Sequence, residues 1–333
     1  MELTELIPGL PEEIAYECLT RLHYSAHGVA SRVCRRWEHL IKSRDFYNYR
    51  KQSGLTHKAA SLIQALPVRP GSKQAGPVVY GISVFDPESG EWARVDPVPK
   101  YPEGLPLFCQ VTSSEGKLVV MGGWDPASYH PVRDVFVYEF TTQRWSRGRE
   151  MPEVRSFFAA GEMDGRLYVS GGHDESKNAL RSARVYDVRA DELSGMSEER
   201  DECEGIVNGS LFWVVSGYGT ESQGEFVGSA EVYEIGSGRW RRVEDAWRAG
   251  ECPRSSVGIG KDGRLFSWGE RDSAVRCGPC GVELGKWAFV SGSGYQGEPH
   301  GFFLREGENG KLRKVDVCED FSGFVQSGCF VEI

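Results

Sequence analysis

The cysteines Cys277 and Cys280 have a spacing that suits redox chemistry, because they stand in the run Cys277-Gly278-Pro279-Cys280. In a redox-active Cys-x-x-Cys site the first cysteine begins a helix, whose N-terminus lowers the pKa of the thiol. The residues that follow here, from Gly281 to Gly285, are a poor start for a helix. The pair is therefore expected to line a proline-glycine turn with buried thiols and to have no redox role.

Metal binding and hydrolytic catalysis have little support in the residue pattern. A zinc site needs a second pair of ligands at finger or ribbon spacing, and the neighbouring cysteines, Cys252 and Cys318, are isolated. After residue 57 the histidines form no His-x-His or His-x-x-x-His pair that would suggest converging acid, base or metal ligands. We expect no metal, no cofactor and no catalytic residue, and an enzyme is kept as an alternative.

The overall charge and hydropathy exclude several classes of partner. A formal net charge of −9 disfavours nucleic acid, since affinity for phosphates comes mainly from Lys and Arg. No apolar run approaches the roughly 18 residues of a membrane helix, and the opening residues are acidic where a signal peptide is basic and then apolar. The chain is expected in the cytoplasm and/or nucleus, with its cysteines mostly reduced.

Residues 1–57 have the periodicity of amphipathic helices. Pro11, followed by two glutamates, suits the first turn of a helix. One apolar stripe then runs from Ile14 through Leu19 to Leu22, and a second runs from Val29 to Ile41. A hairpin of this size has too little core to be stable alone. A partner, or the rest of the chain, is expected to complete it.

From residue 58 a repeat of about 47 residues replaces the helical period. Apolar runs that end in small residues recur at 117–123, 166–172, 210–219 and 264–270. A second series, an apolar strand followed by a turn and a large side chain, places Trp92, Trp145, Leu193, Trp240 and Trp287 at matching positions. Each unit supplies about four short strands, which is the content of one β-propeller blade.

The sequence therefore predicts a mainly β chain with two domains, a helical one over 1–57 and a propeller over 58–333. The length favours six blades, and the five traced landmarks leave five blades open as an alternative. The apolar segment from Phe324 to Val331 is expected to pair with the first blade, near Ala59 to Leu66, and so to close the ring.

The longest loops follow the glycine-ended strands, and they are the expected binding face because such loops vary without disturbing the sheets. Aromatic and arginine side chains dominate interface energetics. The candidate residues for binding a target are Trp124, Tyr129, Arg133, Arg155, His173, Arg181, Tyr218 and Arg254. If the arginines ring one face, they create a local positive patch that favours an acidic or phosphorylated segment.

The segment from Leu6 to Tyr47 resembles the F-box motif over its full length. Leu10-Pro11 matches its opening, Ile14, Leu19 and Leu22 match its first apolar helix, and Val33-Cys34-Arg35-Arg36-Trp37 matches the signature that follows. The connection from His23 to His27 lacks the family's usual proline-containing turn. The downstream units resemble Kelch repeats, so the whole chain is similar to plant F-box/Kelch-repeat proteins. Its last residues are similar to the subgroup that includes the KISS ME DEADLY proteins.

This resemblance implies the substrate-recognition subunit of an SCF-type (Skp-cullin-F-box) ubiquitin ligase. The F-box would bind a Skp-type adaptor, and through it a cullin and a RING subunit, by way of Leu10, Pro11, Ile14, Leu19, Leu22, Val33, Cys34 and Trp37. The propeller would bind a protein destined for ubiquitination and proteasomal degradation, and the subgroup suggests phenylpropanoid enzymes or cytokinin response regulators. A Kelch-type scaffold that binds protein without ubiquitination is the alternative.

Overall fold

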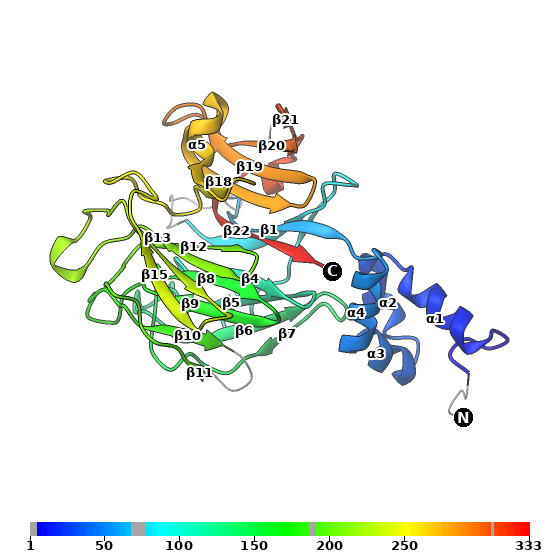
Figure 1. The fold of residues 1–333 in the computed structure, drawn as a ribbon. Helices are drawn as coiled ribbons and strands as arrows, with labels where there is room; N and C mark the ends of the chain where they lie inside the picture. The colour runs from blue at the N-terminus through cyan, green and yellow to red at the C-terminus, as the bar shows by residue number, and fades with distance from the viewer. Residues whose placement is uncertain (1–4, 68–77, 187–190, 308–309) are drawn as a thin grey trace.

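The computed structural model describes residues 5–67, 78–186, 191–307 and 310–333. A group of short helices lies against one side of a ring of antiparallel sheets, and the C-terminus lies close to the helices (Figure 1). The predicted fold class, a mainly β propeller with a small helical N-terminal part, is confirmed.

Four helices make up the N-terminal part: α1 (Glu12–Thr20), α2 (Tyr24–Ala30), α3 (Arg35–Ile41) and α4 (Arg44–Gln52). α1 begins after Pro11, and two glutamates in its first turn complement the helix dipole. α4 begins after Ser43, whose hydroxyl accepts a hydrogen bond from the amide of Phe46 at 3.2 Å. The helices share a small apolar core, which consists of Leu6, Ala15, Leu19, Ala30, Ile41 and Phe46.

Five sheets have four antiparallel strands each, in the orders β22-β1-β2-β3, β4-β5-β6-β7, β8-β9-β10-β11, β12-β13-β14-β15 and β18-β19-β20-β21. In the first three blades the strands are β1 (Lys58–Ala65), β2 (Tyr80–Phe85), β3 (Trp92–Arg94), β4 (Gln110–Ser114), β5 (Lys117–Met121), β6 (Val135–Glu139), β7 (Arg144–Arg147), β8 (Ala159–Met163), β9 (Arg166–Ser170), β10 (Ala183–Tyr186) and β11 (Asp191–Glu192). The others are β12 (Glu204–Asn208), β13 (Leu211–Val215), β14 (Ala230–Glu234), β15 (Arg239–Val243), β18 (Cys277–Leu284), β19 (Trp287–Ser293), β20 (Gly301–Glu306), β21 (Leu312–Lys314) and β22 (Val325–Glu332).

A two-stranded sheet, β16 (Val257–Ile259) with β17 (Leu265–Ser267), lies in the chain between the blade that ends with β15 and the blade that begins with β18. After β17 the chain enters a short helix, α5 (Trp268–Arg271), and a 3-10 turn, η2 (Ser273–Val275), instead of a third strand. The described residues therefore form five complete blades, and the place of a sixth holds only this small sheet.

One of the predicted landmarks is wrong. Trp92, Trp145 and Trp240 lie on the outermost strands β3, β7 and β15, whereas Trp287 begins β19, the second strand of its blade. The small sheet β16-β17 has no third or fourth strand. The step of 47 residues from Trp240 to Trp287 therefore passes over this sheet and ends in the following blade. The spacing that identified the earlier units thus gave the wrong strand for Trp287.

The ring closes as predicted, because β22 pairs with β1. The pairing is antiparallel and runs from Lys58 opposite Glu332 to Gln64 opposite Val325. β22 is the inner strand of the first blade, so a strand from the end of the chain is hydrogen-bonded to strands from its beginning. This pairing places strands from both ends of the chain in one blade, which closes the ring.

The helices are seated on the propeller next to this closure. The main chain of His57 exchanges two hydrogen bonds with Ile333, each 2.9 Å long. Lys51 of α4 forms an ion pair with Glu332 at 3.4 Å, and Tyr24 of α2 packs on the apolar core shared by the first two blades. The rest of the chain thus supplies packing that the small helical part lacks.

Candidate functional site

The helical part exposes several large apolar side chains. Ile14 on α1 is 51% exposed and Val33, before α3, is 60% exposed, while Val29 on α2 is 65% exposed. Leu10, Pro11 and Cys18 are also exposed. Exposed apolar side chains of this size are typical of surfaces that take part in protein–protein contacts. This set, which we call the apolar face, comprises Leu10, Pro11, Ile14, Cys18, Val29 and Val33.

The other residues predicted to contact an adaptor have a structural place. Leu19 is 2% exposed and lies in the helical core, so its proposed direct contact is corrected to a packing role. Leu22, Cys34 and Trp37 are half-buried. The indole Nε1 of Trp37 donates a hydrogen bond to the carbonyl of Leu6 at 2.7 Å, which joins the segment before α1 to α3.

Sequence reasoning missed Cys18 and Val29 as members of the apolar face. Cys18 follows Ile14 by one helical turn, so helical periodicity places both on the same side. Val29 was assigned to the second apolar stripe. In α2 the buried residues are His27, Gly28 and Ala30, and Val29 lies on the side that faces away from the helical core. The stripe alone could not distinguish a face that packs on the core from one that remains open.

Trp124, His173 and Tyr218 occupy equivalent places in three successive blades. Each forms an isolated antiparallel β-bridge with the segment that precedes the first strand of its blade. The partners are Leu107, Ser156 and Asp201, respectively. His173 and Tyr218 are 5% and 6% exposed, and Trp124 is half-buried. His173 and Tyr218 are therefore corrected from exposed loop residues to parts of the wall between blades.

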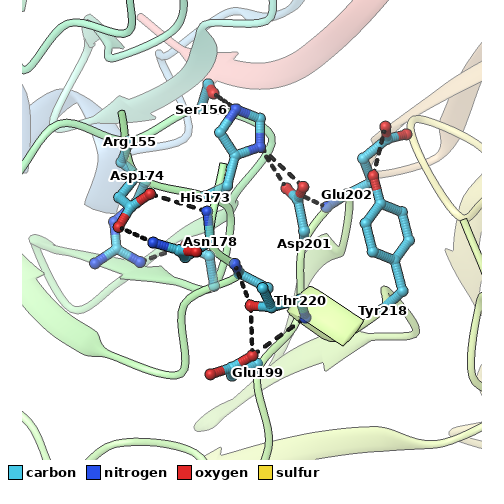
Figure 2. A network of polar contacts seen from close by, with 12 residues as sticks. Arg155, Ser156, His173, Asp174, Asn178, Glu199, Asp201, Glu202, Tyr218 and Thr220 are labelled. Atoms are coloured by element: carbon cyan, nitrogen blue, oxygen red, sulfur yellow. Dashed lines mark hydrogen bonds and ion pairs between the residues drawn. The ribbon is translucent and has the colours of Figure 1, made fainter. Parts of the chain in front are cut away.

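Ser156, His173 and Asp201 are hydrogen-bonded in the order of a serine hydrolase triad (Figure 2). The Ser156 hydroxyl lies 2.7 Å from His173 Nε2, and His173 Nδ1 lies 2.8 Å from Asp201 Oδ2. Ser156 is 0% exposed, and its oxygen also accepts a hydrogen bond from Trp124 Nε1 at 2.8 Å. A nucleophile must reach the carbonyl carbon of its substrate, which a fully buried hydroxyl cannot do. We interpret the network as a cross-link that joins three adjacent blades.

Neighbouring contacts extend this cross-link. The hydroxyl of Tyr218 donates to Glu202 Oε1 at 3.0 Å, and burial raises the pKa of Tyr218. Glu199 accepts hydrogen bonds from both the amide and the hydroxyl of Thr220, whose hydroxyl in turn accepts one from the amide of Ala179 (Figure 2). These bonds fix the loops after β9 and β13 to one another.

Arg155 is corrected from the binding surface to the interior. It is 1% exposed, and its guanidinium donates to the carbonyls of Gly171 and Ser182, to the hydroxyl of Ser182 at 2.7 Å, and to the carboxylate of Glu153. Arg200 of the next blade makes the same kind of contacts, to the carbonyls of Ser216 and Ser229. A buried guanidinium is tolerated when its donors are satisfied in this way. Each of these two arginines connects the segment before the first strand of its blade to the ends of the second and third strands of the same blade.

Arg254 has a different environment, although its local sequence resembles that of Arg155. Its guanidinium carbon lies 5.0 Å from the ring centre of Phe108 and 4.8 Å from that of Phe157, distances at which a cation is attracted to an aromatic face. The two rings are stacked with their centres 4.2 Å apart. Arg254 also faces Glu202 at 3.7 Å. These four residues and Trp124, which contacts both phenylalanine rings edge-on, are called the mouth cluster below.

Four equivalent residues before the first strands of successive units have positive φ. They are Phe108 (57°), Phe157 (56°), Glu202 (50°) and Ser255 (56°). The left-handed conformation is unfavourable for residues with a Cβ, by about 1–2 kcal/mol each, and it persists where the surroundings demand it. Counted from these positions, Arg254 corresponds to Ser156 and not to Arg155. Because Arg254 directly precedes the positive-φ residue, whereas Arg155 stands two residues before it, the Arg254 side chain lies over the phenylalanine rings and does not enter its own blade.

The remaining predicted target-binding residues are exposed but separate. Tyr129 is 52% exposed, and Arg133 and Arg181 are exposed as well. Arg133 pairs with Glu150 at 2.7 Å. The expected ring of four arginines is thus not formed, because Arg155 is buried and both Arg133 and Arg254 face carboxylates.

A channel of about 450 Å³ follows the propeller axis and is lined by β4, β8, β12, β16, β18 and β22. Glu204 of β12 lies in its wall. Burial raises the pKa of Glu204 to about 7, although hydrogen bonds from the amides of Ser255 and Gly205 and the charge of Arg254 act in the opposite direction. Near neutral pH this channel therefore contains a carboxyl group that can gain or lose a proton.

Cys277 and Cys280 lie at the start of β18, with a register shift between them. The predicted turn is a β-bulge, in which Gly278 has a φ of 56°. Cys280 is 1% exposed, and burial raises the pKa of its thiol, which disfavours the reactive thiolate. No helix begins at this pair.

None of the helices in the described part of the chain is both long and apolar enough to cross a bilayer.

Comparisons with known proteins agree with this architecture. Residues 7–49 match the F-box domain, and residues 107–152 and 155–192 match the Kelch motif. The F-box/kelch-repeat protein At1g15670 of Arabidopsis thaliana is 36% identical over 99% of this chain and 100% of its own length. F-box/kelch-repeat protein At2g44130 of the same plant is 41% identical over 73% of this chain and 66% of its own length, and SKIP20 is 39% identical over 73% and 67%.

The F-box match covers α1, α2, α3 and the first two thirds of α4, and the Kelch matches cover the blades β4–β7 and β8–β11. Together with a relative that aligns over nearly the whole length, they show that this chain belongs to the family of plant F-box/kelch-repeat proteins.

Proposed function

We propose that this chain is the substrate-recognition subunit of an SCF-type ubiquitin ligase. The apolar face binds a Skp-type adaptor, which recruits a cullin and a RING subunit, and the propeller binds the protein to be ubiquitinated. The observation that carries the proposal is the apolar face itself, with Ile14, Val29 and Val33 each more than half exposed within the matched F-box. Such a surface is stabilised when a partner covers it.

In this role the chain needs no catalytic group. Its contribution is to hold a target lysine near the charged ubiquitin-conjugating enzyme, which is an effect of proximity and orientation. The contacts of the helices with the first blade, through His57, Ile333 and the Lys51–Glu332 pair, suit this role because they limit how far the two binding surfaces can move apart. We place this activity in the cytoplasm and/or nucleus, without nucleic-acid or membrane partners.

The mouth cluster is the proposed centre of target binding. It combines aromatic rings with an arginine, and these are the residue types that most often dominate interface energies. Tyr129, Arg133 and Arg181 are proposed as contacts at the rim. Because Arg254 and Arg133 face Glu202 and Glu150, aromatic and apolar contacts are expected to contribute more than net positive charge.

The class of target is suggested by the resemblance of the C-terminal residues to the KISS ME DEADLY subgroup. Phenylpropanoid enzymes and cytokinin response regulators are accordingly the first proteins to test. Affinity purification of the full chain after the proteasome is blocked, followed by mass spectrometry, would identify the bound proteins without prior selection.

Adaptor binding is tested with charged substitutions in the apolar face. Ile14→Asp and Val33→Asp should abolish capture of a purified Skp-type adaptor by the full chain, because each places a carboxylate in a surface that binding would dehydrate. Val78→Asp is the matched control, since Val78 is 57% exposed but belongs to the propeller side of the chain. Full adaptor capture by both apolar-face variants would refute the proposal.

A scaffold that binds protein without ubiquitination is the alternative function. It shares the propeller surface but makes no use of the apolar face. If the chain captures target proteins and fails to bind any Skp-type adaptor, the scaffold is correct.

A further inference from the structure

Three side chains with metal-binding groups meet where the helices join the propeller. His23 immediately precedes α2, His57 lies between α4 and β1, and Asp86 directly follows β2. One ligand atom from each lies within 4.8 Å of the other two. The three residues are far apart in the sequence, so the fold alone brings them together.

The carboxylate of Asp86 is held in a fixed orientation. Asp86 is 4% exposed, and its Oδ1 accepts hydrogen bonds from the amides of Glu88 at 2.8 Å and Ser89 at 3.4 Å. Its other oxygen, Oδ2, faces His23 Nε2 at 3.8 Å. The turn after β2 therefore uses one carboxylate oxygen and directs the other toward the imidazoles.

The two histidines are also positioned by their surroundings. His23 Nδ1 lies 2.8 Å from the hydroxyl of Ser25. Nδ1 also accepts a longer hydrogen bond, 3.4 Å, from the amide of Ser25, which caps α2. Binding of a metal at Nε2 requires the proton to be on Nδ1, where it is donated to the Ser25 hydroxyl in place of that longer contact, and the lone pair of Nε2 then points toward Asp86. His57 is fixed through its main chain by the two hydrogen bonds to Ile333, and its ring lies 4.2 Å from that of His23 between centres, at 64°.

We propose that His23, His57 and Asp86 bind one divalent transition-metal ion of the zinc type at the junction of the helices and the first blade. Two imidazoles and one carboxylate are a known ligand set for zinc, with water in the remaining position. Ligand atoms at about 2.0–2.1 Å from zinc lie roughly 3.4 Å from one another. The pair His23 Nε2 and Asp86 Oδ2, at 3.8 Å, is close to that spacing, while the upper limit of 4.8 Å for the set would have to contract by about 1.4 Å. Rotation of the half-exposed His23 ring can adjust its own distances to the other two ligands.

The expected consequence is a cross-link between the two parts of the chain. Each ligand comes from a different element, so the bound ion connects the start of α2, the segment before β1 and the turn after β2. Binding to the folded chain alone stabilises it in proportion to the logarithm of the free ion concentration. The ion would accordingly raise the unfolding temperature and restrict movement of the helices relative to the propeller.

The test uses the full chain, freed of metal with a chelator and titrated with zinc in competition with a chromophoric chelator. We expect one zinc per chain that is lost, or weakened at least about tenfold, in His23→Gln and in Asp86→Asn. His130→Gln is the matched control, because His130 is an exposed histidine in a propeller loop. The double variant Cys277→Ser/Cys280→Ser tests whether the ion resides on thiols instead and should keep its zinc.

Two further measurements make the result independent of folding defects. Cobalt(II) bound at this site should give visible bands without the near-ultraviolet charge-transfer absorption of thiolate ligands. Zinc should raise the unfolding temperature of the wild-type chain but not that of His23→Gln, a change at a side chain that is 40% exposed. Absence of zinc binding by the wild-type chain, or unchanged affinity in His23→Gln, would overturn the proposal. Adaptor capture is measured separately, so its outcome does not bear on the ion.

Discussion

Alanine substitutions in the F-box can separate residues that contact the adaptor from residues that only shape the helices. Ile14 and Val33 are 51% and 60% exposed, whereas Leu19 is 2% exposed and lies in the helical core. All three belong to the matched F-box, and the sequence alone assigned them one role. The structure predicts two different phenotypes.

The expected magnitude for the exposed pair follows from their exposed fractions. Complete burial of an Ile or Val side chain is worth about 1.5–3 kcal/mol, and roughly half of that remains available for adaptor binding when half of the side chain is exposed. Ile14→Ala and Val33→Ala should each weaken binding by about 1 kcal/mol, and the double variant by about 2 kcal/mol, or roughly 30-fold. Neither change should alter the unfolding transition measurably.

Leu19→Ala should behave in the opposite way. Truncation of a buried leucine costs about 2–5 kcal/mol of folding stability, which is a large loss for so small a core. Isothermal titration with the adaptor and helical circular dichroism on the same samples would distinguish the cases. If Leu19→Ala weakened binding while the helices stayed folded, or if the Ile14 and Val33 variants bound normally, the division into contact and core residues would be wrong.

Three other predictions concern the propeller. The buried Ser156 should not react with a fluorophosphonate probe, and Ser156→Ala should lower the free energy of unfolding by about 1–3 kcal/mol, because the indole N–H of Trp124 then loses its acceptor; labelling of the wild-type serine would support an enzyme. The pKa of Glu204 is raised from 4.5 to about 7, so the folded chain binds more protons than the unfolded chain between these pH values. The stabilising contribution of this group is therefore complete below about pH 4.5 and is lost as the pH rises through about 7. Urea unfolding at several pH values should show a weaker pH dependence of stability in Glu204→Gln, and an identical dependence would contradict the assignment. Arg254→Gln should weaken binding of the purified target by about 1–2 kcal/mol and leave adaptor affinity unchanged, whereas Arg264→Gln, at a side chain that is 88% exposed, should change neither; an equal loss of both affinities in Arg254→Gln would indicate misfolding.

The sequence was most informative where a period repeats. Apolar runs ending in glycine located β5, β9 and β13, and the same pattern located β17. The apolar segment near Val331 was correctly paired with the first blade because a propeller requires closure. The repeat length gave the wrong strand for Trp287. The unit before it has lost its outer strands, so the spacing in the sequence is kept while the position of the residue within a blade changes.

Burial within loops was much harder to predict. Arg155 and Arg254 stand in nearly identical local sequences, yet one bonds to carbonyls inside a blade and the other lies over two phenylalanine rings. A shift of one residue relative to the positive-φ position decides between them. Phe108 and Phe157 were not recognised as site residues, because apolar side chains next to a strand ordinarily indicate core. Likewise, nothing in the separate positions of His23, His57 and Asp86 indicates that they meet.

The pairing of β22 with β1 has a consequence for the order of events during synthesis. Residues 325–332 leave the ribosome after all the blades, so the first sheet lacks its inner strand for most of translation. Ile333 and Glu332 also form the seat of the helices, through His57 and Lys51. A nascent or prematurely terminated chain can thus display F-box helices that do not yet have a fixed relation to the propeller. In the proposed role, the relation between the adaptor-binding helices and the propeller therefore depends on the pairing of β22 with β1.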